Sequence, residues 1–165
     1  MGIIVSSFLG CGREYLKNTH GDKIKIYDAV SEFPIKESDG TIRQDKADGY
    51  FNKVMDYVGD NDIVFIGSDK PILDVFDKNN VDYDVFYPSV ERKNEFIENQ
   101  VRKRAPHNII RDMDMHFNEW IDDIDGNNSP NCYKHKMNNK GEYIGNMPLI
   151  MQYIDTLKNQ PKQTN

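Results

Sequence analysis

The sequence has few cysteines, no long apolar run and no excess of basic residues, and each shortage excludes a class of protein. Its two cysteines among 165 residues are too few for a disulfide-stapled scaffold. A membrane-spanning helix needs about 20 apolar residues in a row, and no stretch of this sequence approaches that length. Residues 1–5 lack the basic start of a secretory signal peptide, so we expect a cytoplasmic protein without a membrane partner.

The formal net charge is −6, from 21 basic and 27 acidic residues, and it argues against a broad binding surface for nucleic acid. Nucleic acid and anionic membranes both require a cationic footprint on the protein. A local basic pocket is still compatible with this charge. The length suits a single domain that buries a substantial core.

Short apolar blocks alternate with helical patterns along the first 125 residues. We expect strands within residues 2–9, 24–27, 63–66 and 81–87. We expect helices at residues 13–17, 50–58, 71–79, 89–104 and 109–124. This alternation predicts an α/β fold with a mostly parallel sheet. Ligands of such sheets bind beyond the carboxyl ends of the strands.

The composition changes after residue 125. Residues 126–146 are rich in Asn, Gly and Lys and poor in apolar residues, which predicts a flap or linker that follows a domain at residues 1–125. A short amphipathic helix is expected at residues 147–157, because its apolar residues share one face. Residues 158–165 are expected to be a disordered tail.

A Gly-Cys-Gly turn at residues 10–12 follows the first expected strand. Between a strand and a helix, consecutive backbone N–H groups can wrap an anion, and the helix adds its positive end. The phosphate-loop pattern G-x-x-x-x-G-K-[ST] matches at Gly12, with Ser7 at its first glycine. Arg13 replaces its lysine, and Glu14 replaces the hydroxyl residue that holds magnesium. A tight structural connection is the alternative explanation of the same turn.

The first 125 residues resemble small phage-encoded P-loop nucleotide kinases, which are related to deoxynucleoside monophosphate kinases and to kinases of hydroxymethyluracil in DNA. The resemblance lies in IIVSSFLGCGREYL (3–16), IKIYDAVSEF (24–33) and DIVFIGSDKPILDVFDKNNVDYDVFYPSVERKNEF (62–96). It implies a three-layer P-loop NTPase fold with a short central sheet and a mobile lid. It also implies ATP and Mg²⁺ as phosphoryl donor, and a nucleotide, nucleoside or base in DNA as acceptor.

The resemblance further implies roles for individual residues. The donor phosphates would be cradled by Gly10, Cys11, Gly12 and Arg13, with Glu14 beside them. Asp28 would lie near the acceptor or its magnesium. A lid-like helix would clamp the transferred phosphoryl group with Arg92, Arg102 and Arg104. The alternatives are that Asp28 caps a turn and that the basic run 102–104 is a solvated helix end.

Other residues carry weaker signals of chemistry. Cys132 and His135 have the spacing of metal ligands, but no second pair completes a zinc site. Trp120 lies on the apolar stripe of a helix, where packing in the core is expected and stacking on a base is the alternative. Cys11 is expected to pack rather than to react.

Two functions follow from these observations. The first is an ATP-dependent phosphotransferase acting on a nucleotide, nucleoside or modified DNA base, with DNA as substrate only, in the host cytoplasm if the protein is phage-encoded. The alternative is a catalytically degenerate P-loop protein that binds a nucleotide or a host protein partner. Arg13 and Glu14 motivate this alternative, because phosphoryl transfer depends on positioning and charge neutralisation by the groups they replace.

Overall fold

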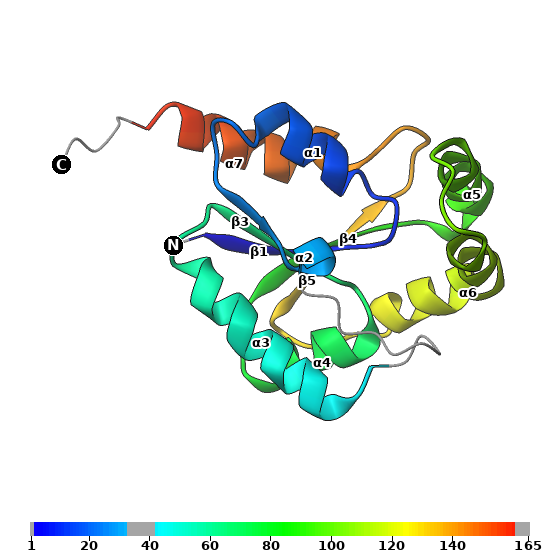
Figure 1. Ribbon diagram of the computed structural model, residues 1–165, viewed down its shortest axis with the longest axis horizontal. Helices are drawn as coiled ribbons and strands as arrows, with labels where there is room; N and C mark the ends of the chain where they lie inside the picture. The colour runs from blue at the N-terminus through cyan, green and yellow to red at the C-terminus, as the bar shows by residue number, and fades with distance from the viewer. Residues whose placement is uncertain (1, 33–41, 161–165) are drawn as a thin grey trace.

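Five short strands form the central sheet of the computed structural model, which describes residues 2–32 and 42–160 (Figure 1). The strands are β1 (Ile3–Ser7), β2 (Ile26–Asp28), β3 (Ile63–Ile66), β4 (Tyr83–Pro88) and β5 (Cys132–Met137). Their spatial order is β2-β3-β1-β4-β5, and every neighbouring pair is parallel. The fold is therefore α/β with an all-parallel sheet, in agreement with the alternation of strands and helices.

Helices cover both faces of the sheet, because each connection between parallel strands must cross one face. Figure 1 shows α1 (Arg13–His20) and α7 (Pro148–Lys158) on one face, and α3 (Gln44–Val58) and α4 (Lys70–Lys78) on the other. Beyond the end of β4, α5 (Lys93–Arg102) packs against α6 (His107–Asp125). The short turns of helix are α2 (Ala29–Glu32), η1 (Val90–Arg92) and η2 (Ile144–Asn146).

The core lies on both sides of the two central strands. All four residues of β3 are fully buried, and β1 is buried from Ile4 onward. A strand covered on both faces cannot place polar residues at alternate positions, which explains why these strands appear in the sequence as continuous apolar blocks. Beyond β1, the ring of Phe8 packs edge-on against Phe96 and Phe117.

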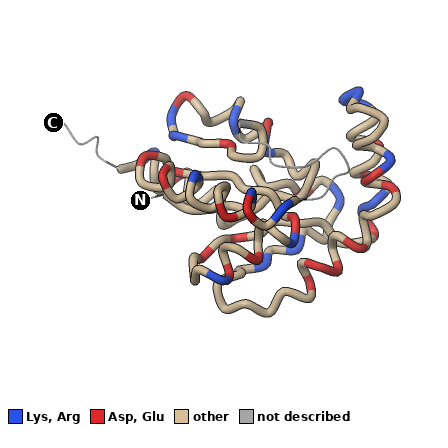
Figure 2. Tube along the Cα trace, turned by 60° about the horizontal axis from the view of Figure 1, so that its bottom comes forward, with Lys and Arg blue, Asp and Glu red and all other residues tan. Residues whose placement is uncertain are grey.

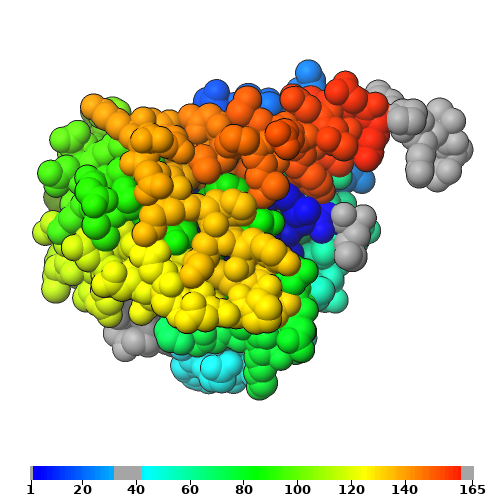
Figure 3. Space-filling model, turned by 180° about the vertical axis from the view of Figure 1, so that it is seen from behind, coloured from blue at the N-terminus to red at the C-terminus, as the bar shows by residue number. Residues whose placement is uncertain are grey.

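The structure differs from the expected flap at residues 126–146, because β5 lies within this range and pairs with β4 along its whole length. At the edge of the sheet, β5 exposes much of its side-chain surface, so its sequence lacks an apolar block. The residues after it nevertheless complete the core, since Met137, Ile144, Ile150 and Ile154 are buried. Figure 3 shows this segment, coloured orange to red, covering one face of the molecule from β5 to α7.

Helix α7 lies within one residue of its expected bounds and continues through Lys158, and residues 161–165 of the expected disordered tail lie outside the described residues. Within the described ranges, no helix combines the length and apolarity that a membrane crossing demands. Acidic and basic residues are interspersed along most elements of the described chain (Figure 2).

Candidate functional site

The turn after β1 combines two left-handed glycines with the start of a helix. Gly10 has φ of 89° and Gly12 has φ of 93°, a region that residues with a Cβ atom disfavour. Arg13 then enters the right-handed helix α1. A left-handed residue followed by a right-handed one directs successive N–H groups toward one point, which forms an anion-binding concavity. Gly12 has no side chain to cap α1, so the N–H groups of the first turn rely on water or a ligand.

Neighbouring elements pack closely on this turn. A Cβ atom on Gly10 would lie 3.0 Å from Nε2 of Gln100, which belongs to α5. A Cβ atom on Gly12 would lie 3.2 Å from the Cβ atom of Tyr143, just before η2. A Cβ atom at either position would therefore crowd a neighbouring side chain, and the backbone conformation favours glycine at both. The anion-binding and structural explanations of the turn are both compatible with this geometry.

Cys11 anchors the turn from its buried side. Its side chain is buried, and its Sγ atom lies 3.5 Å from the carbonyl oxygen of Phe86. Its backbone N–H donates to the carbonyl of Phe8, and its own carbonyl accepts the N–H of Ile144. Burial raises the pKa of the Cys11 thiol well above its ordinary value, so this side chain stays protonated. Cys11 is a packing residue whose contribution to the turn comes from its backbone.

The side chain of Arg13 connects the ends of β1 and β2. Its Nε donates to Oδ2 of Asp28 at 2.7 Å. Its terminal nitrogens lie 3.3 Å from Oγ of Ser7 and 3.5 Å from Oγ of Ser31. The guanidinium is therefore held by three elements, because Ser7 closes β1, Asp28 closes β2 and Ser31 lies in α2. The cation that the loop pattern predicts is present, and its shortest contact is with a protein carboxylate.

Asp28 is fully buried and accepts hydrogen bonds on both carboxylate oxygens. Oδ1 accepts the backbone N–H groups of Val30 and Ser31, so Asp28 caps the turn into α2. Oδ2 accepts from Arg13, from Lys17 at 3.0 Å and from the hydroxyl of Ser31 at 3.0 Å. Burial opposes ionisation of this carboxyl, but the charge of Arg13 and the hydrogen bond from Lys17 outweigh it, so the pKa of Asp28 lies below its ordinary range. The lone pairs of Asp28 are occupied.

Neither Glu14 nor Asp28, the two acidic residues that the resemblance places near the phosphates or the acceptor, is placed to hold a magnesium ion. The Glu14 side chain is 59% exposed, and it pairs loosely with Lys17 at 3.6 Å. Asp28 has no lone pair left for a metal. Across the described part of the chain, no three Asp, Glu, His or Cys side chains are placed to hold a metal ion together. A magnesium ion bound with a nucleotide would therefore need ligands other than Glu14 and Asp28.

A cavity of about 410 Å³, which we call the switch-point cavity, opens beside Arg13. It lies at the carboxyl ends of β1 and β3, where α1 leaves toward one face of the sheet and α4 toward the other (Figure 1). Open α/β sheets bind ligands where successive connections diverge in this way. Its size is within the range of small-molecule sites. The apolar part is lined by Val30, Ile42, Pro71, Ile109 and Trp120, and the polar part by Ser7, Ser68, the cations Arg13 and Lys70, and the acids Asp69, Glu119 and Asp123.

Trp120 combines the two roles considered for it from the sequence. Its ring packs edge-on against Phe8, with the centroids 5.9 Å apart, so it extends the aromatic core. It is also partly exposed and lines the switch-point cavity. The indole therefore gives the cavity a flat apolar wall, supported by the core behind it.

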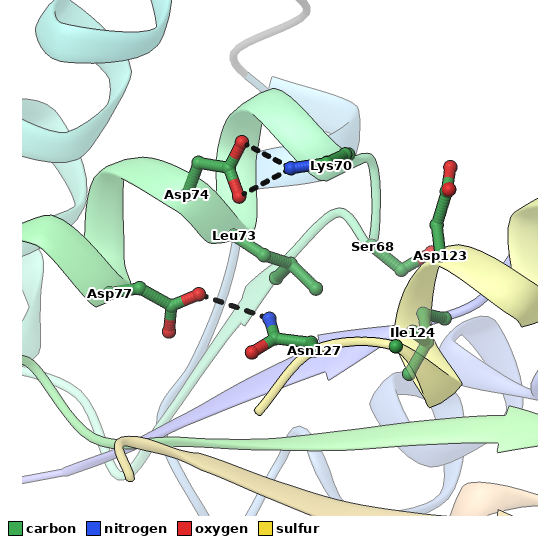
Figure 4. Close-up of a pocket in the computed structure, with 9 residues that line it drawn as sticks. Ser68, Lys70, Leu73, Asp74, Asp77, Asp123, Ile124 and Asn127 are labelled. Atoms are coloured by element: carbon green, nitrogen blue, oxygen red, sulfur yellow. Dashed lines mark hydrogen bonds and ion pairs between the residues drawn. The ribbon is translucent and has the colours of Figure 1, made fainter. Parts of the chain in front are cut away.

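A second cavity of about 210 Å³ lies between α4 and the end of α6 and shares Ser68, Lys70 and Asp123 with the first (Figure 4). Its acidic side chains are largely engaged with protein groups. Lys70 pairs with Asp74 at 2.9 Å, and Asp77 accepts the amide of Asn127 at 3.0 Å. We regard this cavity as a polar gap between packed helices.

The three arginines expected on a lid do not line the switch-point cavity in the described structure. The Arg92 side chain is only 4% exposed and forms a bidentate pair with Glu95 at 2.9 and 2.6 Å. It also donates to the backbone carbonyls of Met137 and Glu142, so it ties η1 to the segment after β5. Arg102 and Arg104 are exposed at the end of α5.

Sequence analysis missed the partners that fix Arg13. Ser7 appeared only as a departure from the loop pattern, and Ser31 and Lys17 received no role. Two local signals point to them. Lys17 lies four residues after Arg13 and so shares its face of α1, and Ser31 lies three residues after Asp28, the spacing of a capping turn.

The comparisons with known proteins leave the family open. No protein-family model matches the chain, and no curated protein does. Among solved structures, the chain resembles the crystal structure of an uncharacterized protein from Eubacterium ventriosum, with 16% sequence identity and a TM-score of 0.48. The alignment covers 94% of this chain and 99% of that one.

Proposed function

We propose that this protein binds a nucleoside phosphate in the switch-point cavity, with the phosphate at the Gly12 turn. The observation that carries the proposal is a cavity of about 410 Å³ at the diverging edge of a parallel sheet, lined by Leu9 and Arg13, the residues that flank the glycine turn. Phosphates bind at such turns because backbone N–H groups and the helix dipole act together.

The charges near the turn favour recognition by the backbone. Arg13 and Lys17 carry two positive charges, and Asp28 and Glu14 carry two negative charges within the same cluster of ion pairs. The formal charges of the cluster therefore cancel, and the fixed N–H dipoles of the turn supply much of the attraction for an anion. This type of site is compatible with a net charge of −6 for the whole chain.

The apolar lining of the cavity suits a base or a sugar. Trp120, Ile109 and Pro71 belong to this lining. Stacking of a base on an aromatic side chain contributes about 1–3 kcal/mol and tolerates different bases. The cavity thus offers separate environments for the two parts of a nucleotide.

Fluorescence provides a direct test, because Trp120 is the single tryptophan of the sequence. We expect nucleotides to change the emission of Trp120 in a saturable way and to raise the melting temperature, since a ligand bound to the native state stabilises it by about 2.7 kcal/mol at 100 times its Kd. Ile109→Arg should abolish both responses by filling the cavity. Met115→Arg, on an exposed part of the same helix, is the matched control. Failure of every nucleotide to elicit either response would refute the proposal.

Phosphoryl transfer, the activity expected from the resemblance, is the second candidate. It is favoured by the position of Arg13, which begins the helix after the turn and also lines the cavity, so a donor phosphate and an acceptor would meet there. The test is release of ADP from ATP with deoxynucleoside monophosphates, nucleosides and DNA as acceptors. Turnover that disappears in Gly12→Val would support transfer. Nucleotide binding without turnover by any acceptor would leave a binding protein.

A further inference from the structure

The guanidinium of Arg13 has more N–H donors than it uses in hydrogen bonds to the described residues. Of the five N–H donors of an arginine, three are engaged, by Asp28, Ser7 and Ser31. The remaining two have no partner among the described residues. The side chain is 17% exposed, and Arg13 is one of the residues that line the switch-point cavity.

We propose that Asp28, Ser7 and Ser31 are positioning residues that hold the Arg13 guanidinium in the cavity wall, where its remaining N–H donors bind the phosphate of the nucleotide. This inference rests on the function proposed above and specifies which side chain recognises the phosphate. A guanidinium binds phosphate through parallel N–H donors in a fixed plane, so the orientation of that plane decides the strength of the contact. Restraining it before binding reduces the entropy lost when the ligand arrives.

The environment of Asp28 explains how this carboxylate can anchor Arg13 without neutralising it. Asp28 shares its negative charge between Arg13 and Lys17, which lie 2.7 and 3.0 Å from Oδ2. Two backbone N–H groups stabilise the other oxygen. Glu14 brings the formal charge of this cluster to zero, but its side chain is 59% exposed, so solvent screens its charge more than that of the buried Asp28. Arg13 therefore keeps an attraction for a phosphate.

A lysine at position 13 would not have this geometry. Its ammonium is a point charge on a flexible stem and cannot contact Asp28, Ser7 and Ser31 with separate nitrogens. Arg13→Lys restores the lysine of the phosphate-loop pattern, so it separates the two explanations of this residue. Our proposal predicts weaker phosphate recognition in this variant, whereas a loop that needs lysine predicts stronger recognition.

The experiment compares the affinity for a nucleoside monophosphate with the affinity for the same nucleoside without phosphate, by titration calorimetry or Trp120 fluorescence. We expect the wild-type protein to prefer the phosphorylated form by at least about tenfold, the scale of a charge-assisted contact. Asp28→Asn and Arg13→Lys should reduce this preference to about threefold or less, because they weaken binding of the phosphorylated ligand much more than binding of the nucleoside. A variant that only loses structure would instead show lower affinity for both ligands. Asp45→Asn, which removes an exposed partner of Arg43, is the control for loss of an Asp–Arg pair.

The outcomes distinguish the inference from the function on which it rests. Unchanged or increased phosphate preference in Asp28→Asn or in Arg13→Lys would overturn the inference. Equal binding of both ligands by the wild type would overturn it together with the phosphate part of the proposed function, while the cavity would still be a nucleoside site. Binding of neither ligand would overturn the proposed function as well. If Asp28→Asn does not fold, Ser31→Ala serves instead, because it removes one exposed hydroxyl that contacts both Arg13 and Asp28. In Ser31→Ala, the preference for the phosphorylated ligand over the nucleoside should fall by about threefold, and an unchanged preference would count against the inference.

Discussion

Single side chains at the edge of the sheet serve both structure and the proposed site. Asp28 caps α2, neutralises part of two cations and orients one of them. Gly12 permits the left-handed turn and leaves room for Tyr143. Because each residue has several contacts, its substitution has consequences that a sequence motif alone does not specify.

Gly12→Ala tests the requirement for glycine in the turn. We expect it to lower the free energy of unfolding by about 2 kcal/mol, because alanine disfavours positive φ and its Cβ atom would crowd Tyr143. Gly49→Ala is the matched control, since nothing lies within 4 Å of the added Cβ atom and position 49 is inside α3. It should stabilise the protein by about 0.5–1 kcal/mol. Urea denaturation measures both changes, and equal effects would contradict the structure of the turn.

Glu95 gives a prediction with a defined pH dependence. Hydrogen bonds from Arg92 lower the pKa of Glu95 from 4.5 to about 2, so the carboxylate stabilises the folded state fully above about pH 4.5. That contribution is lost as the pH falls toward 2. Glu95→Gln should cost about 3 kcal/mol near neutral pH, because it leaves the buried Arg92 guanidinium without its counter-charge. The difference from wild type should shrink steadily in denaturation curves recorded toward about pH 3. A difference independent of pH would show that the pair is not the cause.

Strands β1, β2, β3 and β4 were predictable from the sequence, and the edge strand β5 was not. β1 and β3 are covered on both faces of the sheet, so successive side chains are buried whichever face they point to. Their sequences are therefore continuous apolar blocks. β5 reads Cys-Tyr-Lys-His-Lys-Met, and its formation depends on pairing with β4, a tertiary contact that no local pattern encodes. The glycine turn and Asp28 were found as candidates, whereas the contacts of Arg13 with Ser7 and Ser31 required knowledge of which strand ends are neighbours.

Helix α7 allows a test of how firmly the last segment belongs to the core. Ile154→Ala should lower the free energy of unfolding by about 2–4 kcal/mol, because Ile154 is 2% exposed and its loss leaves a cavity. Met151→Ala on the same helix should change it by less than about 0.5 kcal/mol, since Met151 is 49% exposed. Chemical denaturation distinguishes the two variants. Similar small effects would mean that α7 does not contribute to the core.

At the scale of the whole molecule, one apolar core includes residues from both sides of position 125. The sheet is completed by β5, and four buried residues after position 125 contact the same apolar cluster. Such a core has no boundary at which the last segment can be removed without exposing apolar surface. The boundary placed at residue 125 on compositional grounds therefore falls inside the structural unit.

A truncated chain comprising residues 1–125 tests this conclusion. We expect it to lack a cooperative unfolding transition, because it loses the edge strand and the helix that covers one face of the sheet. A chain comprising residues 1–160 keeps all described elements and should retain the transition. Circular dichroism during urea titration measures both. A sharp transition in the shorter chain would place the structural boundary at residue 125 after all.

The exposed edge strand β5 has a consequence for the behaviour of the protein at high concentration. Its open side presents unpaired backbone groups that another chain's strand could join, which is how many proteins begin to form fibres. Lys134 and Lys136 are exposed on this strand and bind Asp125 through a backbone carbonyl and a carboxylate. An incoming strand would have to strip water from two ammonium groups and disrupt these contacts. These two lysines are also the reason why the sequence of β5 lacks an apolar pattern. On the folded chain they oppose pairing of the β5 edge with a strand of another molecule.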